Sequence, residues 1–262
     1  MSAMEGAAGS SAAAGTLEGA VALVTGGGKG IGQAAARRLA ALGARVAILD
    51  LDAAAAAAAA APLPDALAVA ADVGDYEAMR AAIGRVLQTC GRIDVLVNNA
   101  GWDRLQPFLD NDPALWDRLI AVNLKGVLNA CHLVVPQMVA RGSGRVVNVA
   151  SDAGRVGSSG EAVYSACKGG TIAFTKSLAR EVARAGVTVN CVCPGPTATP
   201  LLAEIRGDAT GDRIIDAIVR ATPTRRLAQP EEIAAAIAFF AAGPAHVTGQ
   251  VLSVSGGLTM AG

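Results

Sequence analysis

Short apolar segments alternate with longer helical segments along almost the whole chain. Most of the short segments are apolar at consecutive positions, which is typical of strands buried on both faces of a parallel sheet. Because each parallel strand needs a crossover to the next, the alternation predicts an α/β fold, a Rossmann-type doubly wound parallel sheet of about seven strands with helices on both faces. The predicted strands are 21–25, 45–50, 67–71, 93–97, 145–149, 187–192 and 250–254, and the predicted helices are 30–42, 53–60, 75–90, 112–140, 161–185, 211–220 and 230–242.

The chain length of 262 residues suits one large domain or two small ones. Between residues 18 and 262 the composition shows no shift that would mark a linker, so we expect a single domain there. Residues 1–17 are rich in Ala, Gly and Ser and lack the basic start and apolar centre of a secretory signal, so we expect a disordered extension. Residues 193–211 hold three prolines after a predicted strand, which predicts a mobile loop or lid.

The composition disfavours several classes of function. Lys and Arg total 22, as do Asp and Glu, and only 17% of the residues are charged, which argues against a surface for nucleic acid or anionic lipid. Pro or Gly interrupts the apolar runs before they reach the length of a membrane span, so we expect none. The five cysteines show no CxxC spacing, which indicates reduced thiols in the cytoplasm. The two histidines lie in no cluster of ligand-type residues, so we expect no metal site.

A glycine-rich segment, TGGGKGIG at residues 25–32, lies between the first predicted strand and the first predicted helix. Glycines there allow a tight turn and close approach of the backbone to a pyrophosphate, while the helix N-terminus offers free N–H groups to the anion. The spacing departs from GxGxxG, so the flanking strand and helix carry most of the prediction. We expect a dinucleotide to be bound here by Gly26, Gly28, Lys29, Gly30, Ile31 and Gly32.

The second predicted strand ends at Asp50, 18 residues beyond Gly32. An acidic residue at about this distance binds the adenosine ribose hydroxyls in dinucleotide sites, and its charge would repel a 2′-phosphate. The position of Asp50 therefore favours NAD over NADP as the cofactor. A solvated strand end is the alternative role for Asp50, and Lys29 and Arg45 are basic residues that would attract a 2′-phosphate.

A second group of candidates surrounds Tyr164. Tyr164 and Lys168 are four residues apart on a predicted helix and therefore share one helical face. A neighbouring cation favours the phenolate and lowers the tyrosine pKa towards a value useful for proton transfer. Ser151 follows the strand at 145–149, at the carboxyl end where open α/β sheets bind ligands, and its hydroxyl is suited to bind a substrate oxygen.

From about residue 18 to its end, the chain resembles the short-chain dehydrogenase/reductase family. The resemblance implies that Tyr164 is the general acid and base, that Ser151 positions the reacting oxygen, and that Lys168 lowers the tyrosine pKa and binds the nicotinamide ribose. Asn123 would hold a water that links Lys168 to solvent. The segments that carry the resemblance are TGGGKGIG at 25–32, Asp72-Val73, NNAG at 98–101, Asn123, Ser151, YSACK at 164–168 and PGPTAT at 194–199.

The same resemblance implies the remaining cofactor contacts and the assembly. It assigns Asp72 and Val73 to the adenine and Asn99 to the floor of the cofactor site. It also implies a homotetramer in which the helices around 112–140 and 161–185 pair between subunits. The other expected contacts are Pro194, Gly195 and Thr199 at the nicotinamide end, together with Leu51, Ala100, Gly101 and Thr197.

Within the family, four segments resemble dehydrogenases that oxidise the ring alcohol of 2-hydroxycyclohexanecarboxyl-CoA to the 2-oxo thioester with NAD. They are residues 98–103, 150–170, 192–203 and 248–260. Trp102 and Ala153 lie in these segments and are expected to face the substrate, together with Ser151 and Tyr164. We therefore expect NAD-dependent oxidation of a secondary, cyclic alcohol. Reduction of a 3-oxoacyl thioester, oxidation of free secondary or cyclic alcohols, and a non-enzymatic NAD-sensing protein are the alternatives.

Overall fold

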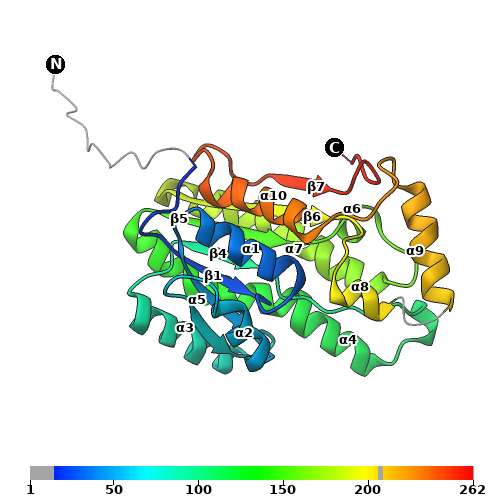
Figure 1. The fold of residues 1–262 in the computed structure, drawn as a ribbon, viewed down its shortest axis with the longest axis horizontal. Coiled ribbons are helices and arrows are strands. Elements are labelled where there is room, and N and C mark those ends of the chain that lie inside the picture. Colours follow the sequence, from blue (N-terminus) through cyan, green and yellow to red (C-terminus); the bar gives the residue numbers. More distant parts are fainter. Residues whose placement is uncertain (1–14, 206–208, 262) are drawn as a thin grey trace, which may run out of the picture.

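The computed structural model of the protein describes residues 15–205 and 209–261. This part of the chain folds around a seven-stranded sheet whose neighbouring strands are all parallel, in the order β3-β2-β1-β4-β5-β6-β7 (Figure 1). The predicted fold class is therefore confirmed. The strands are β1 (Val21–Thr25), β2 (Arg45–Asp50), β3 (Leu67–Ala70), β4 (Val95–Asn98), β5 (Gly144–Val149), β6 (Val187–Pro194) and β7 (Val251–Val254).

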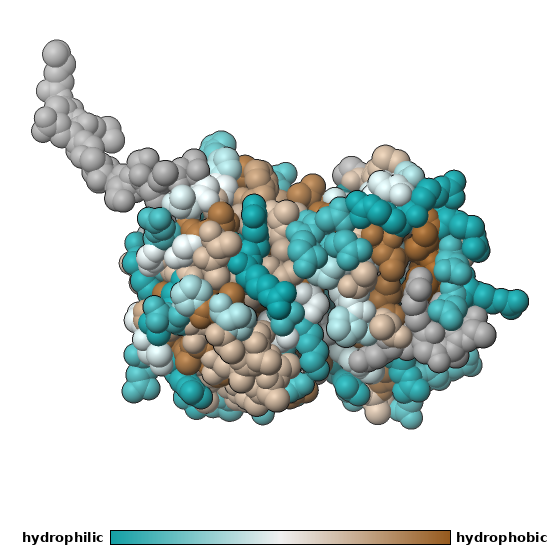
Figure 2. Space-filling model, in the orientation of Figure 1, coloured by the Kyte–Doolittle hydropathy of each residue, from teal (hydrophilic) through white to brown (hydrophobic). Residues whose placement is uncertain are grey.

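Helices cover both faces of the sheet because side chains along each strand alternate between the faces. Val24 and Ile48 pack with one layer of helices, and Leu23 and Leu49 pack with the other. The alanines of α2 form the pale brown patch at the lower left of Figure 2. The first layer contains α1 (Gly30–Ala41), α2 (Ala53–Ala60) and α10 (Pro230–Ala242), and the second contains α3 (Tyr76–Cys90), α5 (Gly126–Arg141) and α7 (Ala162–Val182).

The region predicted as one helix over 112–140 has a π-helical turn inside it. Helix α4 (Pro113–Ile120) continues through the π-helical turn (Ala121–Lys125) into α5 without a break. Pro136 lies inside α5 rather than ending it. The continuous helix Pro113–Arg141 is long and apolar enough, by length and composition alone, to cross a membrane, although no such segment was expected from the sequence. Half of its most apolar window is buried inside the fold, as in a core helix.

The segment after β6, predicted as a loop over 193–211, contains helical structure. Helix α8 (Pro200–Ile205) begins at a proline, which is favourable in the first turn of a helix, and α9 (Ala209–Ala221) follows residues 206–208, which lie outside the described residues. The shorter helices were below the length at which periodicity can be recognised in the sequence. They are α6 (Ala153–Val156) and the 3₁₀ turns Phe108–Asp110 and Ala183–Ala185.

The N-terminal boundary of the fold lies slightly earlier than expected. Residues 1–14, which make up most of the expected extension, lie outside the described residues. Leu17 is buried, and its N–H group donates a hydrogen bond of 2.7 Å to the carbonyl of Leu42. Packing against the core therefore begins before residue 18.

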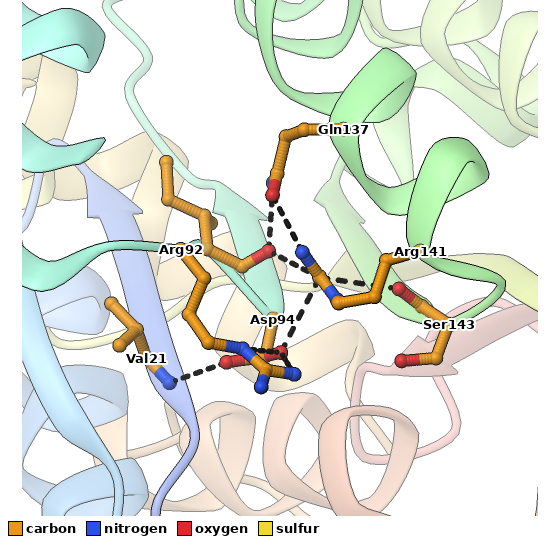
Figure 3. Close-up of polar contacts among 7 residues, drawn as sticks. Val21, Arg92, Asp94, Gln137, Arg141 and Ser143 are labelled. Atoms are coloured by element: carbon orange, nitrogen blue, oxygen red, sulfur yellow. Dashed lines mark hydrogen bonds and ion pairs between the residues drawn. The ribbon is translucent and has the colours of Figure 1, made fainter.

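At the amino end of the sheet, the largely buried carboxylate of Asp94 ties neighbouring strands together (Figure 3). Its Oδ2 accepts a hydrogen bond of 2.9 Å from the N–H group of Val21, which begins β1. Its Oδ1 accepts from Nε of Arg92 at 2.8 Å and lies 3.3 Å from Nη2 of Arg141, which also donates to the carbonyl of Ser143 beside β5. These contacts stabilise the end of the sheet at which the strands begin.

Candidate active site

A cavity of about 1010 Å³ opens at the carboxyl edge of the sheet. It lies where the strand order reverses between β1 and β4, the position at which open α/β sheets bind ligands. Apolar side chains gather beside α8 and α9 at the right of Figure 2, and Leu202 and Ile215 of these helices line the cavity. Gly28, Gly32 and Asn123 do not line it. The predicted site residues on its wall are Gly26, Lys29, Gly30, Ile31, Asp50, Leu51, Asp72, Val73, Asn99, Ala100, Gly101, Trp102, Ser151, Ala153, Tyr164, Lys168, Pro194, Gly195, Thr197 and Thr199.

The glycine-rich loop is held by contacts that leave no room for side chains. Gly26 has a φ of +60°, and a Cβ there would lie 2.7 Å from Cα of Ala100. A Cβ at Gly32 would lie 2.1 Å from the carbonyl oxygen of Gly26. Nδ2 of Asn99 donates to the carbonyls of Thr25 and Gly26 at 3.1 and 3.0 Å. The loop is therefore fixed against the N-terminus of α1, and its bare backbone fits the pyrophosphate of a dinucleotide.

Asp50 holds the same loop from the end of β2. Its Oδ2 accepts from the N–H group of Gly28 at 2.9 Å, and its Oδ1 accepts from that of Asp52 at 3.0 Å. A Cβ at Gly28 would lie 2.8 Å from Asp50 Oδ2, which explains the glycine at this position. Nζ of Lys29 lies nearby and forms a 3.1 Å ion pair with Asp52. This end of the cavity thus presents both a carboxylate suited to ribose hydroxyls and a cation suited to a 2′-phosphate.

Helix α7 positions Tyr164 and Lys168 against the end of β5. Lys168 is buried, and its Nζ donates to the carbonyl of Val149 at 3.1 Å and lies 5.6 Å from the centre of the Tyr164 ring. Burial lowers the pKa of Lys168 to about 8. The hydroxyl of Ser151, two residues beyond β5, is hydrogen-bonded to the Tyr164 phenol. The structure therefore brings three of the predicted catalytic side chains together at the cavity wall.

The pKa of Tyr164 shifts in the direction opposite to the one expected from the sequence. Lys168 was expected to lower it, yet the pKa is raised well above the usual value for a phenol. Desolvation by the surrounding protein is the largest cause, and the charges of Asp103 and Glu161 add to it. The hydrogen bond with Ser151 opposes the shift but is weaker. Tyr164 is therefore in its protonated form at neutral pH.

Asn123 lies directly behind this wall, inside the π-helical turn, and is fully buried. Its Nδ2 donates to the carbonyls of Trp102 and Leu119 at 2.7 and 3.0 Å, and its Oδ1 accepts from the N–H group of Trp102 at 3.2 Å. A Cβ at Gly101 would lie 3.2 Å from Asn123 Oδ1 and 3.4 Å from Nζ of Lys168. Asn123 therefore fixes the chain at Trp102 beside Lys168, and its expected part in a water relay stays a prediction.

A buried polar chain that was not predicted from the sequence connects α7 to the sheet. Nδ2 of Asn98 on β4 donates to Oδ1 of Asn148 on β5 at 2.8 Å, and Nδ2 of Asn148 donates to the hydroxyl of Thr175 on α7 at 2.8 Å. All three residues are buried. Because an unpaired buried polar group is costly, these bonds fix the depth of α7 and hence the position of Tyr164.

The cavity wall also contains charged residues that were not predicted from the sequence, among them Asp103, Arg118 and Glu161. Asp103 is only 7% exposed, and burial first and Glu161 second raise its pKa to about 8. The guanidinium of Arg118 lies over the ring of Trp102, 3.8 Å from its centre. The only signal in the sequence was the place of Asp103 two residues after NNAG. Across the described ranges no group of three or more His, Cys, Asp or Glu side chains is arranged to hold a metal ion.

Comparisons with known proteins agree with this geometry. Residues 20–210 match the family model described as short chain dehydrogenase. The chain is 40% identical to Nodulation protein G of Azospirillum brasilense over 244 residues, which cover 91% of this chain and 97% of that protein. It is 39% identical to an acetoacetyl-CoA reductase of Acinetobacter sp. (strain RA3849) over 247 residues, which cover 92% of this chain and 98% of the relative. The crystal structure of levodione reductase matches with a TM-score of 0.88 and 31% identity, over 92% of this chain and 98% of the other. The matched region contains the glycine-rich loop, Ser151, Tyr164 and Lys168, and the chain therefore belongs to the short-chain dehydrogenase family.

Proposed function

We propose that this oxidoreductase converts a secondary alcohol to a ketone with NAD and catalyses the reverse reduction. The observation that carries the proposal is the grouping of Ser151, Tyr164 and Lys168 on one wall of the cavity that begins at the glycine-rich loop. When bound, NAD supplies the acceptor for the hydride of the carbinol carbon. Membership of the family supports a nicotinamide cofactor.

Tyr164 handles the proton in this proposal. In the oxidising direction its phenolate takes the hydroxyl proton of an alcohol that Ser151 holds by a hydrogen bond, and in the reducing direction the phenol returns the proton to the ketone oxygen. The Lys168 ammonium, 5.6 Å from the ring centre, stabilises the phenolate by its charge. General acid–base catalysis of this kind supplies about 10²- to 10⁴-fold, and orientation of the substrate supplies much of the rest.

The choice of NAD over NADP rests on Asp50. Its carboxylate would accept hydrogen bonds from ribose hydroxyls and would repel a 2′-phosphate. The charge of Lys29, which would favour the phosphate, is offset by its ion pair with Asp52. The test compares kcat/KM with NAD and with NADP in the wild type and in Asp50→Asn. The wild type should prefer NAD, and the substitution should weaken this preference.

For the substrate we propose a cyclic alcohol carrying a CoA thioester, with 2-hydroxycyclohexanecarboxyl-CoA as the first candidate. The segments that carry this narrower resemblance contribute Trp102, Ala153 and the loop before α7 to the cavity. Relatives named as reductases of acetoacetyl-CoA and of 3-oxoacyl-[acyl-carrier-protein] support a thioester. Reduction of a 3-oxoacyl thioester is the second candidate, and the protonated state of Tyr164 at neutral pH favours it.

Turnover of Tyr164→Phe tests the mechanism. We expect a loss of about 10³-fold or more in kcat with little change in cofactor affinity, because the ring stays and only the proton carrier is removed. The matched control is Tyr76→Phe, which removes the chain's other tyrosine hydroxyl, a group bonded to His132 at 2.9 Å and absent from the cavity wall. Retention of most turnover in Tyr164→Phe would contradict the proposal.

The substrate class is tested by following NADH absorbance with free cyclic alcohols, hydroxyacyl-CoA esters and 3-oxoacyl-CoA esters. Activity on free alcohols alone would rule out the thioester. Binding of NAD without turnover of any of these compounds would favour the NAD-sensing alternative. We also propose a homotetramer and a cytoplasmic location, as the family resemblance and the reduced cysteines led us to expect.

A further inference from the structure

Arg118 is a cation on the cavity wall that the proposed proton transfer does not use. The central carbon of its guanidinium lies over the ring of Trp102, 3.8 Å from the ring centre, and both residues line the cavity. A guanidinium stacked on an aromatic face is held from one side and keeps the N–H groups on its edge for acceptors such as carboxylate and phosphate. The stack is therefore suited to bind an anion that enters the cavity.

Asn123 fixes the backbone on both sides of this stack. Its buried Nδ2 donates to the carbonyl of Trp102 at 2.7 Å and to the carbonyl of Leu119, the residue after Arg118, at 3.0 Å. One side chain therefore joins the segment that carries the indole to the turn of α4 that carries the guanidinium. The relative position of these two backbones is set by the fold, so the stack belongs to the wall of the cavity.

Arg118 has no acidic partner in the described part of the chain, where no Asp or Glu side chain lies at ion-pair distance from its guanidinium. The other basic residues that line the cavity are already engaged. Lys29 forms its ion pair with Asp52, and Lys168 is buried and donates to the carbonyl of Val149. The charge of Arg118 is therefore available to a ligand.

The rest of the wall would repel an anion. Acidic side chains outnumber basic ones by five to three among the described residues that line the cavity. A negatively charged substrate is therefore bound well only where its charge lies against a cation. The apolar side chains of α8 and α9 on the same wall suit a ring or an acyl chain and offer nothing to a charge. The acidic residues are Asp50, Asp72, Asp103, Asp152 and Glu161, and the basic residues are Lys29, Arg118 and Lys168.

We propose that Arg118, stacked on Trp102, binds an anionic group of the substrate at a distance from the reacting carbon and thereby selects anionic alcohols. This inference rests on the proposed function and deepens it, because it assigns a residue to the choice of substrate. Phosphate and carboxylate offer the guanidinium the same chemistry, charged oxygens that accept its N–H groups. A CoA thioester supplies phosphates, and the free hydroxy acid supplies a carboxylate. Arg118 acts on the affinity for substrate and leaves the proton transfer at Tyr164 unchanged.

Three forms of one alcohol test the proposal: 2-hydroxycyclohexanecarboxyl-CoA, the uncharged N-acetylcysteamine thioester of the same acid, and the free acid. Arg118→Met keeps the length of the side chain and removes its charge. We expect kcat/KM for the anionic form that the protein uses to fall about tenfold or more, through KM, and that for the uncharged thioester to change by less than about twofold. A loss confined to the CoA ester identifies the anion as phosphate, and a loss confined to the free acid identifies it as carboxylate. An equal change for all three compounds, or none for any, would overturn the proposal.

Two further variants separate the guanidinium from charge in general. Arg118→Lys keeps the charge without the planar fork, so it should retain part of the preference for the anionic form. Arg85→Met makes the same change in net charge on the exposed side of α3, outside the cavity, and should leave kcat/KM unchanged for all three compounds. A loss in Arg85→Met as large as that in Arg118→Met would show an effect of net charge alone and would overturn the assignment.

Calorimetry in the presence of NADH measures binding without reaction, because NADH cannot oxidise an alcohol. The dissociation constant of the anionic form should rise about tenfold in Arg118→Met, and that of the uncharged thioester should stay the same. If the anionic form binds in this way but no alcohol is oxidised with NAD, the inference stands and the proposed function fails. If alcohols are oxidised but Arg118→Met changes neither binding nor KM, the proposed function stands and the inference fails.

Discussion

Lys168 is held in the fold at a cost in stability. Its ammonium is buried, and its pKa falls from 10.5 to about 8 because desolvation outweighs the nearby charges. A lysine with a lowered pKa destabilises the folded state fully below the folded pKa, and the penalty disappears as the pH rises towards the unfolded value. Between about pH 8 and 10.5 this residue therefore makes stability rise with pH.

We predict that Lys168→Met stabilises the protein while abolishing activity. The free energy of unfolding should rise by about 1–3 kcal/mol below pH 8, after allowing for the lost hydrogen bond to Val149, and the gain should fade above that pH. Denaturant unfolding at several pH values measures the effect. Lys176→Met, which replaces an exposed lysine on the same helix, should change stability little. A variant at position 168 that is less stable than wild type at pH 7 would contradict the prediction.

Site residues could be predicted from the sequence where their positions depend on local spacing along the chain. Tyr164 and Lys168 share a helical face at a fixed spacing, and Ser151 follows a strand, so all three reach the cavity wall. Asp103 and Glu161 were missed because the fold brings them to the cavity from segments far apart in the chain, and no periodicity encodes this. The direction of the Tyr164 pKa shift was missed for the same reason, since it depends on burial and on those two carboxyl groups.

At the scale of elements, the glycine-rich loop and the first turn of α1 act as one unit. A Cβ at Gly32 would lie 2.1 Å from the carbonyl oxygen of Gly26, which belongs to the glycine-rich loop, and 2.5 Å from Nδ2 of Asn99, which donates to that loop. Relief of these clashes requires the helix to move away from the loop. The loop's shape is therefore a property of how α1 packs against it, as well as of its own glycines.

We predict that Gly32→Ala raises the KM for the cofactor at least tenfold and lowers the free energy of unfolding by about 2–4 kcal/mol, as overpacking against backbone does. Gly84→Ala is the matched control, because a Cβ there meets nothing within 4 Å in the interior of α3. It should stabilise the protein by about 0.5–1 kcal/mol through helix propensity and leave the KM unchanged. Enzyme kinetics and chemical unfolding of the two variants decide between these outcomes.

The elements themselves were predictable where burial alone determines them. The five inner strands are almost entirely buried and the edge strands β3 and β7 are partly exposed, yet short apolar runs identified all seven within a few residues of their observed ends. Helix α8 was missed because three prolines near it indicated a loop, although a proline in the first turn is compatible with a helix. The π-helical turn was missed because no local sequence pattern marks it. It contains Asn123, whose side chain donates a hydrogen bond to the backbone of a segment distant in the chain.

At the scale of the whole molecule, the scarcity of charge has a structural consequence. Apolar side chains remain exposed on the long helix from α4 to α5, where Ile120, Leu128 and Val139 are 44%, 38% and 40% exposed. The same helix is apolar enough to qualify as a membrane span, yet half of its most apolar window is buried by the rest of the fold. Pairing of this helix between subunits, as in the proposed homotetramer, would cover these exposed side chains.

We predict that the wild-type protein sediments at four times the chain mass and that Leu128→Glu with Val139→Glu reduces this mass. Each glutamate would place an uncompensated charge in the apolar contact between paired helices, a penalty large enough to separate subunits without unfolding the chain. Leu109→Glu is the control, because its side chain is 94% exposed in the 3₁₀ turn before α4 and should tolerate a charge. Analytical ultracentrifugation measures the masses, and circular dichroism shows whether the variants stay folded. A wild-type protein that sediments as a single chain would rule out the tetramer and leave the exposed face of this helix without a partner subunit.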